Sequence, residues 1–287
     1  MDLNQVMISN LMAQIGNHTN AELDESMLRH MILNSVRAYH VKYHREYGEL
    51  VIAADSVNSW RRKIYPYYKA NRRKTREKSE LDWTLIFTTL NKVREELTEF
   101  FPYRVVQVDT AEADDVIATL VKHHRANQKI LILSGDKDFI QLHGENVAQF
   151  DPVHKRKIEH DDPASYLFEH VLRGDSGDGV PNVLSPDDIF MTAGTRQKPM
   201  TAKKFSAWHL MGNVGTAQFY EDLENNQTLS RNFERNRLLI DLSCIPSDVE
   251  NKIIEEFNAQ SGKDRSKLMN YFMVNRLRYL MDSINDF

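Results

Sequence analysis

The stretch that decides the fold is Lys129-Ile130-Leu131-Ile132-Leu133-Ser134-Gly135-Asp136-Lys137-Asp138. A short apolar run that ends in small and acidic residues is typical of a buried strand in a parallel sheet. Two similar runs, 50–54 and 104–108, come earlier and are followed directly by Asp55 and Asp109. The sequence therefore predicts three strands of one sheet, each with an acid at its carboxyl end.

Helical patterns separate these runs. Apolar residues recur at helical spacing over 24–47, from Leu90 to Phe100, and over 112–124, and Gly48 follows the first pattern as a stop signal. Alternating strands and helices predict the α/β class, with a mostly parallel sheet and helices on both faces. Beyond about residue 160 the pattern changes to helical segments and polar loops. We expect an α/β domain over 1–160 and a helical domain over 161–287.

Composition excludes several classes of protein. The 287 residues are 41% hydrophobic and carry a net charge of −4, which excludes disorder and a uniformly basic surface. The single Cys244 excludes intrachain disulfides and Cys-rich zinc sites, and indicates a reducing compartment. No apolar run is long enough to span a bilayer, and no signal peptide is evident. We expect a cytoplasmic protein with no membrane partner.

The net charge conceals a strongly basic segment. Residues 61–78 contain nine Lys or Arg and one Glu, a local charge of +8, with Tyr65, Tyr67 and Tyr68 among them. Cations beside aromatic rings suit a phosphate backbone whose bases can stack. A solvated helix face is the alternative interpretation. We favour nucleic-acid binding because acidic residues are also clustered elsewhere.

Ligands of open parallel sheets bind at the carboxyl ends of the strands. That rule gathers six carboxylates at one edge: Asp55, Glu112, Asp114, Asp115, Asp136 and Asp138. Any one of them could simply cap a helix. Together they repel one another by roughly 3 kcal/mol per close pair, so the cluster predicts divalent cations, and oxygen ligands favour Mg²⁺ or Mn²⁺. Asp175 and Asp178 add two acids at a Gly-rich turn.

A two-metal carboxylate site beside a basic segment predicts phosphodiester hydrolysis. The sequence has no GxxxxGK[ST] loop, which argues against an ATP-driven machine. One alternative is a structure-specific DNA fork-binding protein with weak catalysis. Another is a phosphatase acting on small molecules, although the +8 segment is larger than a small ester needs.

Four ordered motifs resemble the 5′-nuclease or flap-endonuclease family, and within it the free-standing ribonucleases H of large tailed bacteriophages. The resemblance runs nearly end to end. The motifs are Trp60-Arg61-Arg62-Lys63-Ile64-Tyr65-Pro66-Tyr67-Tyr68-Lys69-Ala70-Asn71-Arg72, Glu112-Ala113-Asp114-Asp115, Ser134-Gly135-Asp136-Lys137-Asp138-Phe139-Ile140-Gln141-Leu142 and Gly174-Asp175-Ser176-Gly177-Asp178.

The resemblance implies a role for each matching residue. The first metal environment would comprise Asp2, Asp55, Glu112, Asp114, Asp115 and Asp136, and the second Asp138, Asp175 and Asp178. Arg61, Lys69 and Arg72 would contact the scissile phosphate from the start of a helical arch, which the family folds from the basic segment, here about 60–82. Tyr68 would stack on the terminal base. Further nucleic-acid contacts would come from Arg62, Lys63, Arg73, Lys74, Lys203 and Lys204.

The resemblance also implies an activity. Relatives are Mg²⁺-dependent 5′→3′ exonucleases and flap endonucleases that remove RNA primers during lagging-strand synthesis. The domain 1–160 would then be the nuclease domain, and 161–287 would bind duplex DNA through a helix–turn–helix element that can hold K⁺. The resemblance further implies a monomer in the host cytoplasm, with a sliding clamp and a single-strand DNA-binding protein as possible partners.

The sequence departs from the family pattern in two places. Only Met1 precedes Asp2, where relatives have a buried strand, so either the natural start lies earlier or that strand is missing, together with any clamp-binding peptide. A missing strand would leave Asp2 loosely held. Gly179 stands where relatives usually have Asn, and 184–204 forms an altered or extended loop. These changes weigh against K⁺ binding and a firm grip on the duplex.

Overall fold

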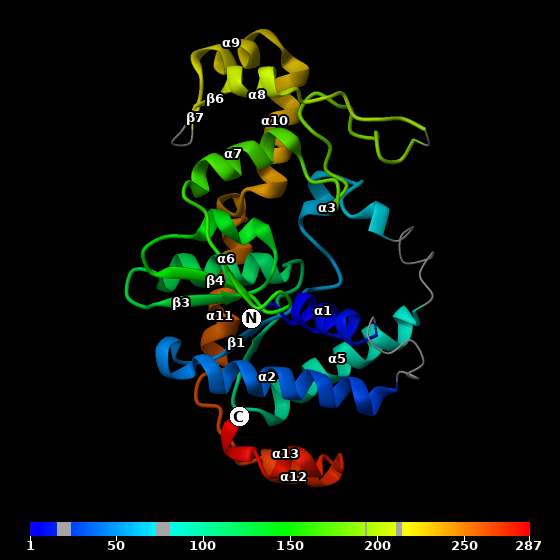
Figure 1. Ribbon diagram of the computed structural model, residues 1–287, viewed down its shortest axis with the longest axis vertical. Helices are drawn as coiled ribbons and strands as arrows, with labels where there is room; N and C mark the ends of the chain where they lie inside the picture. The colour runs from blue at the N-terminus through cyan, green and yellow to red at the C-terminus, as the bar shows by residue number, and fades with distance from the viewer. Residues whose placement is uncertain (16–23, 73–80, 193, 211–213) are drawn as a thin grey trace.

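The computed structural model describes residues 1–15, 24–72, 81–192, 194–210 and 214–287 (Figure 1). Residues 73–80 of the predicted arch, with Arg73 and Lys74, lie outside the described residues. The described start of the basic segment contains the short helix α3 (Arg61–Ile64), and residues 70–72 are helical again.

The predicted parallel sheet is confirmed, with shorter strands. Strand β1 (Val51–Ala53) pairs in parallel with β2 (Arg104–Val106), placing Ile52 opposite Val105. Strand β3 (Ile130–Leu133) pairs in parallel with β4 (Val147–Asp151), which pairs antiparallel with β5 (Arg156–Ile158). Strands β4 and β5 were not predicted, because β4 alternates buried and half-buried residues and β5 is largely exposed.

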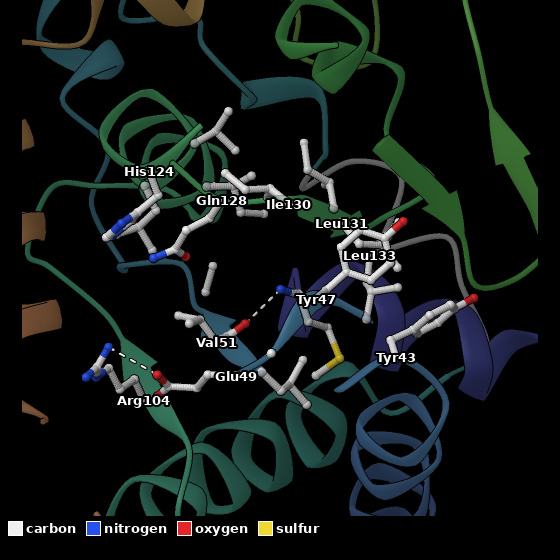
Figure 2. A pocket seen from close by; sticks show the side chains of 18 of the residues that line it. Tyr43, Tyr47, Glu49, Val51, Arg104, His124, Gln128, Ile130, Leu131 and Leu133 are labelled. Carbon is white, nitrogen blue, oxygen red and sulfur yellow. Dashed lines mark hydrogen bonds and ion pairs between the residues drawn. The ribbon is translucent and has the colours of Figure 1, made fainter. Parts of the chain in front are cut away.

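The first two residues join the two groups of strands. The Met1 amine donates to Val51 O (2.8 Å), Ala53 N donates to Met1 O (2.8 Å), and Asp2 N donates to Leu133 O (3.2 Å). A pocket of about 250 Å³ lies beside this junction, and Figure 2 shows Val51, Ile130 and Leu133 among the residues that line it. The expectation that Asp2 is loosely held is wrong: its backbone completes both ladders, and the residue is only 5% exposed.

Alternate strand residues face two apolar cores, as a sheet covered on both faces requires. Ile52, Val105 and Leu133 pack in one core with α1 (Leu3–Ile15), α2 (Glu25–Tyr47) and α5 (Trp83–Phe100). Val106 and Ile132 pack in the other core with α6 (Ala113–His124) and α11 (Ser247–Ala259). The helices on both faces are thus confirmed. Asp24 caps α2 by accepting from Met27 N, and Gly48 ends the helix with φ +77°.

The remaining helices divide into two groups. Helices α7 (Pro163–Arg173), α8 (Ala202–Trp208), α9 (Ala217–Asn225) and α10 (Gln227–Ile240) form one end of the elongated molecule (Figure 1). Helix α11 returns to the sheet, and α12 (Leu268–Val274) and α13 (Arg278–Met281) pack onto the core of α2 and α5. Residues after about 242 therefore cover the α/β region, because the apolar faces of α5 and α6 would otherwise contact water.

Several short elements complete the described chain. They are the 3₁₀ turns η1 (Lys137–Leu142), η2 (Leu242–Cys244) and η3 (Ile284–Asp286), and the two-residue strands β6 (His209–Leu210) and β7 (Val214–Gly215). Among the described residues, no helix is long and apolar enough to cross a membrane. Within 181–201, the described residues form turns and no helix, so a second helix does not directly follow the Gly-rich turn.

Candidate active site

The acids predicted from the strand ends meet beside the junction of the two strand groups. Asp55 follows β1, and its carboxylate accepts from Ala113 N (2.8 Å) at the start of α6 and from Asn4 Nδ2 (2.9 Å). Asp136 follows β3 and caps the turn η1 by accepting from Asp138 N (3.0 Å). The N-terminus of α6 and the first turn of η1 thus hold two of the carboxylates in fixed orientations.

Four of these acids hold protons more tightly than usual. Burial raises the pKa of Asp2 to about 7, and the charges of Asp55 and Asp136 add to the effect. The pKa values of Asp114 and Asp138 are raised well above the usual value, first by burial and then by the charge of Asp136. Burial also raises the pKa of Asp136. Buried carboxylates repel one another when no cation lies between them, and this repulsion favours the binding of a divalent ion.

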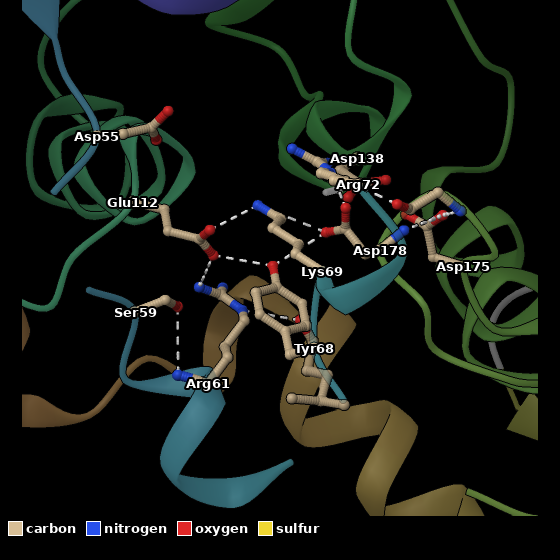
Figure 3. Close-up of polar contacts among 12 residues, drawn as sticks. Asp55, Ser59, Arg61, Tyr68, Lys69, Arg72, Glu112, Asp138, Asp175 and Asp178 are labelled. Carbon is tan, nitrogen blue, oxygen red and sulfur yellow. Dashed lines mark hydrogen bonds and ion pairs between the residues drawn. The ribbon is translucent and has the colours of Figure 1, made fainter. Parts of the chain in front are cut away.

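Glu112 differs, because the chain supplies its counter-charges. Burial alone would raise its pKa, but Lys69 and Arg61 outweigh burial and hold it at about 2. Lys69 Nζ lies 2.5 Å from Glu112 Oε1, and Arg61 Nη1 lies 3.1 Å from Glu112 Oε2 (Figure 3). Lysine and arginine from the basic segment therefore neutralise part of the cluster, which the spacing along the sequence did not predict.

Asp115 is fully buried, and its carboxylate contacts protein groups. Arg61 Nη2 lies 2.8 Å from Asp115 Oδ1, while Trp60 Nε1 (3.1 Å) and Glu112 N (2.9 Å) donate to Oδ2. Glu112 and Asp115 form a reciprocal capping box at the start of α6. This placement revises the interpretation of Asp115 as a metal ligand: it fixes the helix start and the segment that carries Arg61.

Arg61 and Tyr68 are also buried, at 2% and 4% exposure. Arg61 Nε donates to Leu239 O (2.9 Å), which ties the guanidinium to α10 as well as to the acids. The Tyr68 hydroxyl lies 2.8 Å from Glu112 Oε2 and 2.9 Å from Asp178 Oδ2. Both side chains are thus engaged within the acidic cluster, and their contacts with a phosphate and a base stay predictions. Arg61 and Tyr68 position Glu112.

Lys69 and Arg72 do lie at the surface of the acidic cluster. Lys69 Nζ bridges Glu112 and Asp178, with 3.6 Å to Asp178 Oδ2, and Arg72 pairs with Asp178 Oδ1 (Figure 3). Lys69 N donates to Asp178 O (2.7 Å), and Asn71 Nδ2 donates to Ser176 O (2.7 Å). The start of the basic segment is thus fastened to the Gly-rich turn.

The Gly-rich turn after α7 presents two acids to the site. Asp175 Oδ1 accepts from Gly177 N (2.7 Å), and Val180 N donates to Asp175 O (2.7 Å), which closes the turn. Gly179 adopts φ +74°, and a Cβ there would lie 3.1 Å from Tyr67 O. Gly or Asn tolerates such a φ better than other residues, so Gly179 is compatible with the turn although relatives usually have Asn there.

His170 is a site residue that was not predicted from the sequence. Its ring lies in the last turn of α7, where one ligand atom each from Asp138, His170 and Asp175 lie within 4.8 Å of one another. Burial lowers the pKa of the imidazole. The available signal was helical spacing, because a residue one turn before the Gly-Asp motif stands beside that motif.

The remaining predicted contacts are spread over the surface. Arg62 and Lys63 on α3 are exposed, as are Lys203 and Lys204 on α8, where Lys204 Nζ stands 4.5 Å from the centre of the Trp208 ring. Helix α8 belongs to the far end of the molecule in Figure 1, apart from the acidic cluster. These lysines stay predicted duplex contacts.

Comparisons with known proteins identify the family. Residues 6–169 match the family model described as "5'-3' exonuclease, N-terminal resolvase-like domain". The chain belongs to the 5′-3′ exonuclease family. Residues 163–287 match the model of the C-terminal region of T4 RNase H. As a member of the 5′-3′ exonuclease family the chain is a nuclease, a hydrolase of phosphodiester bonds.

Relatives of the 5′-3′ exonuclease family are similar over different lengths. The ribonuclease H of Enterobacteria phage T4 is 35% identical, over 100% of this chain and 94% of the relative. The flap endonuclease Xni of Shewanella woodyi is 31% identical over 50% of this chain and 57% of its own length.

Solved structures agree with this fold. The bacteriophage T5 D15 flap endonuclease, solved as a pseudo-enzyme-product complex with DNA and metal ions, matches with a TM-score of 0.63 at 20% identity. The alignment covers 88% of this chain and 96% of that structure. A T5 5′-exonuclease structure with zinc bound matches with a TM-score of 0.61 at 18% identity, over 88% of this chain and 96% of that one.

Proposed function

We propose that this nuclease depends on two divalent metal ions, Mg²⁺ or Mn²⁺, and cleaves at the 5′ ends of nucleic-acid duplexes. One observation carries the proposal: Asp2, Asp114, Asp136 and Asp138 are brought together from different segments, and the pKa of each is raised. A fold that buries repelling carboxylates without a basic partner for each is stabilised by cations bound among them.

The donor sets suit hard cations. Asp2, Asp55, Asp114 and Asp136, with Glu112 beside them, would hold one ion through oxygen alone, and Asp138, Asp175 and Asp178 would hold the other. Bound there, such ions would lower the pKa of an attacking water and stabilise the leaving oxygen of an in-line displacement.

The basic side chains have two different tasks in this proposal. Arg61 keeps Glu112 ionised and oriented from within the core. Lys69 and Arg72, with side chains 14% and 46% exposed, stand on the open side of the acids and would bind the scissile phosphate. Their bonds to Glu112 and Asp178 hold the two basic side chains in place before a phosphate arrives.

The substrates that we propose are RNA·DNA hybrids and DNA duplexes with 5′ ends, flaps or forks. The curated relatives are named ribonuclease H and flap endonuclease, which supports both kinds of substrate. From the resemblance we further propose primer removal during lagging-strand synthesis by a monomer, with a sliding clamp and a single-strand DNA-binding protein as partners. K⁺ binding at the Gly174–Val180 turn remains part of the same proposal.

The test incubates the full chain with a 5′-labelled RNA·DNA hybrid and with a 5′-labelled DNA flap, in Mg²⁺, in Mn²⁺ and in EDTA. We expect short 5′ products that disappear in EDTA. The relative rates on the hybrid and the flap give the substrate preference. Intact substrate despite a fork complex that weakens steeply with salt would instead support the catalytically weak DNA-binding protein.

A further inference from the structure

His170 places a nitrogen ligand between two of the acids. Helix α7 carries the imidazole toward Asp138 in η1, and Asp175 begins the turn that follows the helix. The three potential ligand atoms lie within 4.8 Å of one another, and the His170 side chain is 16% exposed. Figure 3 shows Asp138, Asp175 and Asp178 on the opposite side of Lys69 from Glu112.

The separation between His170 and Asp138 is too long for an ordinary hydrogen bond. His170 Nδ1 lies 3.4 Å from Asp138 Oδ1, whereas N–H···O bonds in proteins cluster at about 2.7–3.2 Å. Another His–Asp pair of this chain shows the ordinary geometry: His154 Nδ1 lies 2.7 Å from Asp151 Oδ2. Two ligands at about 2.1 Å from one ion are about 3.0–3.4 Å apart at octahedral or tetrahedral angles. The separation of the His170 pair therefore fits two ligands of one ion better than it fits an ordinary hydrogen bond.

The chemistry of the donors distinguishes the two metal positions. The position around Asp2, Asp55 and Asp114 contains carboxylates, which suit Mg²⁺. The position with His170 combines an imidazole with carboxylates, and imidazole suits transition metals. Mg²⁺ keeps its own water shell and is seldom held through nitrogen.

We infer that His170 is a ligand of the second metal position and makes that position selective for Mn²⁺ or another transition metal over Mg²⁺. The inference rests on the proposed two-metal function and specifies which ion each position takes. The first position accepts Mg²⁺, while the second position, formed by Asp138, His170 and Asp175, binds a transition metal more tightly.

The decisive measurement is spectroscopic and needs no turnover. The full chain, stripped of metal with EDTA and dialysed, is loaded with one equivalent of Mn²⁺ in the presence of excess Mg²⁺. Electron spin echo envelope modulation then detects a nitrogen nucleus bonded to Mn²⁺. We expect a nitrogen coupling in the unaltered chain. Bound Mn²⁺ without such a coupling would overturn the inference.

Affinities separate His170 from the other histidines. His170→Gln should weaken Mn²⁺ binding at one site by about 10–100-fold, the range seen when a metal's supporting groups are removed, and should change Mg²⁺ affinity by no more than about twofold. His154→Gln is the matched control, because it removes a histidine paired with a single aspartate. His170→Asp, which restores an all-oxygen set, should move the preference of this position back toward Mg²⁺.

The outcomes separate this inference from the proposed function. A chain that binds neither Mn²⁺ nor Mg²⁺ would remove the two-metal function and the inference together. A chain that binds both ions and cleaves DNA, but shows the same Mn²⁺ affinity with His170→Gln as without it, would leave the function standing and remove the role of His170. Thermal unfolding of each variant checks that the fold is retained.

Discussion

The two sides of the acidic cluster differ in what offsets the repulsion between their carboxylates. On one side, Arg61 and Lys69 lie against Glu112, and the pKa of that carboxyl falls to about 2. On the other side, the pKa of Asp2 rises to about 7, and those of Asp114 and Asp138 rise well above the usual value. The protein neutralises the first side with its own cations, and in our proposal bound ions neutralise the second side. Asp178 would belong to both, because it pairs with Lys69 and Arg72 and is also a proposed metal ligand.

The largest expected effect is on turnover. Asp136→Asn removes a carboxylate from the side that has no partner cation, so turnover should fall by at least about 10²–10³-fold, comparable to the loss of a main electrostatic group in other enzymes. Duplex binding should stay largely intact, because Asp136 faces the acids and not the basic segment. Cleavage rates and fluorescence-anisotropy binding measure the two quantities.

Asp109→Asn is the control for that substitution. Asp109 also follows a strand but is exposed and lies near Ser56 Oγ (3.3 Å). The Asp109→Asn variant should cleave its substrates at the rate of the unaltered chain. Lost duplex binding in Asp136→Asn with unchanged metal affinity would contradict the division between the two sides.

The next effect is on folding. Arg61→Met would leave Glu112 and Asp115 buried without their guanidinium, which should lower the free energy of unfolding by about 3–5 kcal/mol. Urea denaturation measures the change. Arg62→Met, at the exposed neighbouring position, is the control and should change stability by less than about 0.5 kcal/mol. Equal, small effects of both substitutions would mean that Arg61 does not neutralise this side.

A pair of substitutions should have effects of opposite sign in metal-free protein. A carboxyl with a raised pKa in the folded state stabilises the fold below pH 4 and loses that contribution as the pH rises toward 7. The free energy of unfolding of Asp2→Asn, relative to that of the unaltered chain, should therefore rise by on the order of 1–3 kcal/mol between pH 4.5 and 6.5. Glu112→Gln should destabilise the chain in the same window, since it removes the partner of Lys69 and Arg61.

Thermal unfolding in EDTA at several pH values measures both variants. Saturating Mg²⁺ should reverse the advantage of Asp2→Asn, because the ion binds the carboxylate and not the amide. Parallel pH profiles for the two variants would contradict the contrast between the sides.

The smallest expected effect concerns the N-terminus. Burial lowers the pKa of the Met1 amine from 8.0 to about 6, because the charged amine lies within the strand ladder. Protonation therefore destabilises the fold, and stability rises with pH between about 6 and 8. Extending the chain by Gly-Ser before Met1 replaces the amine with an amide that can donate the same bond to Val51 O. We expect a gain of about 1 kcal/mol at pH 7, larger at pH 5.5 and absent above pH 8.5. A gain that is independent of pH would exclude the buried charge as its cause.

Local patterns were sufficient for most of the α/β region. Helix α2 begins after Asp24 and ends before Gly48 as predicted, and the apolar runs before Asp55 and Asp136 form β1 and β3. These elements follow from nearest-neighbour chemistry: capping side chains, helical periodicity and continuous apolar residues. Strand β5 escaped prediction because its stability comes from pairing with β4 and not from its own largely exposed residues.

The sequence by itself predicted that the acids after β1 and β3 and at the start of α6 converge, because the carboxyl ends of parallel strands meet at one edge; Asp109, which also follows a strand, stays outside. Only the tertiary structure decided how each carboxylate is neutralised. Arg61 lies against Glu112 and Asp115, about fifty residues away in sequence, and His170 reaches Asp138 from a helix of the second region. Charge pairing depends on distance in space and on burial, neither of which sequence spacing contains. Similar acids along the chain therefore become a structural anchor at Asp115 and candidate metal ligands at Asp2 and Asp138.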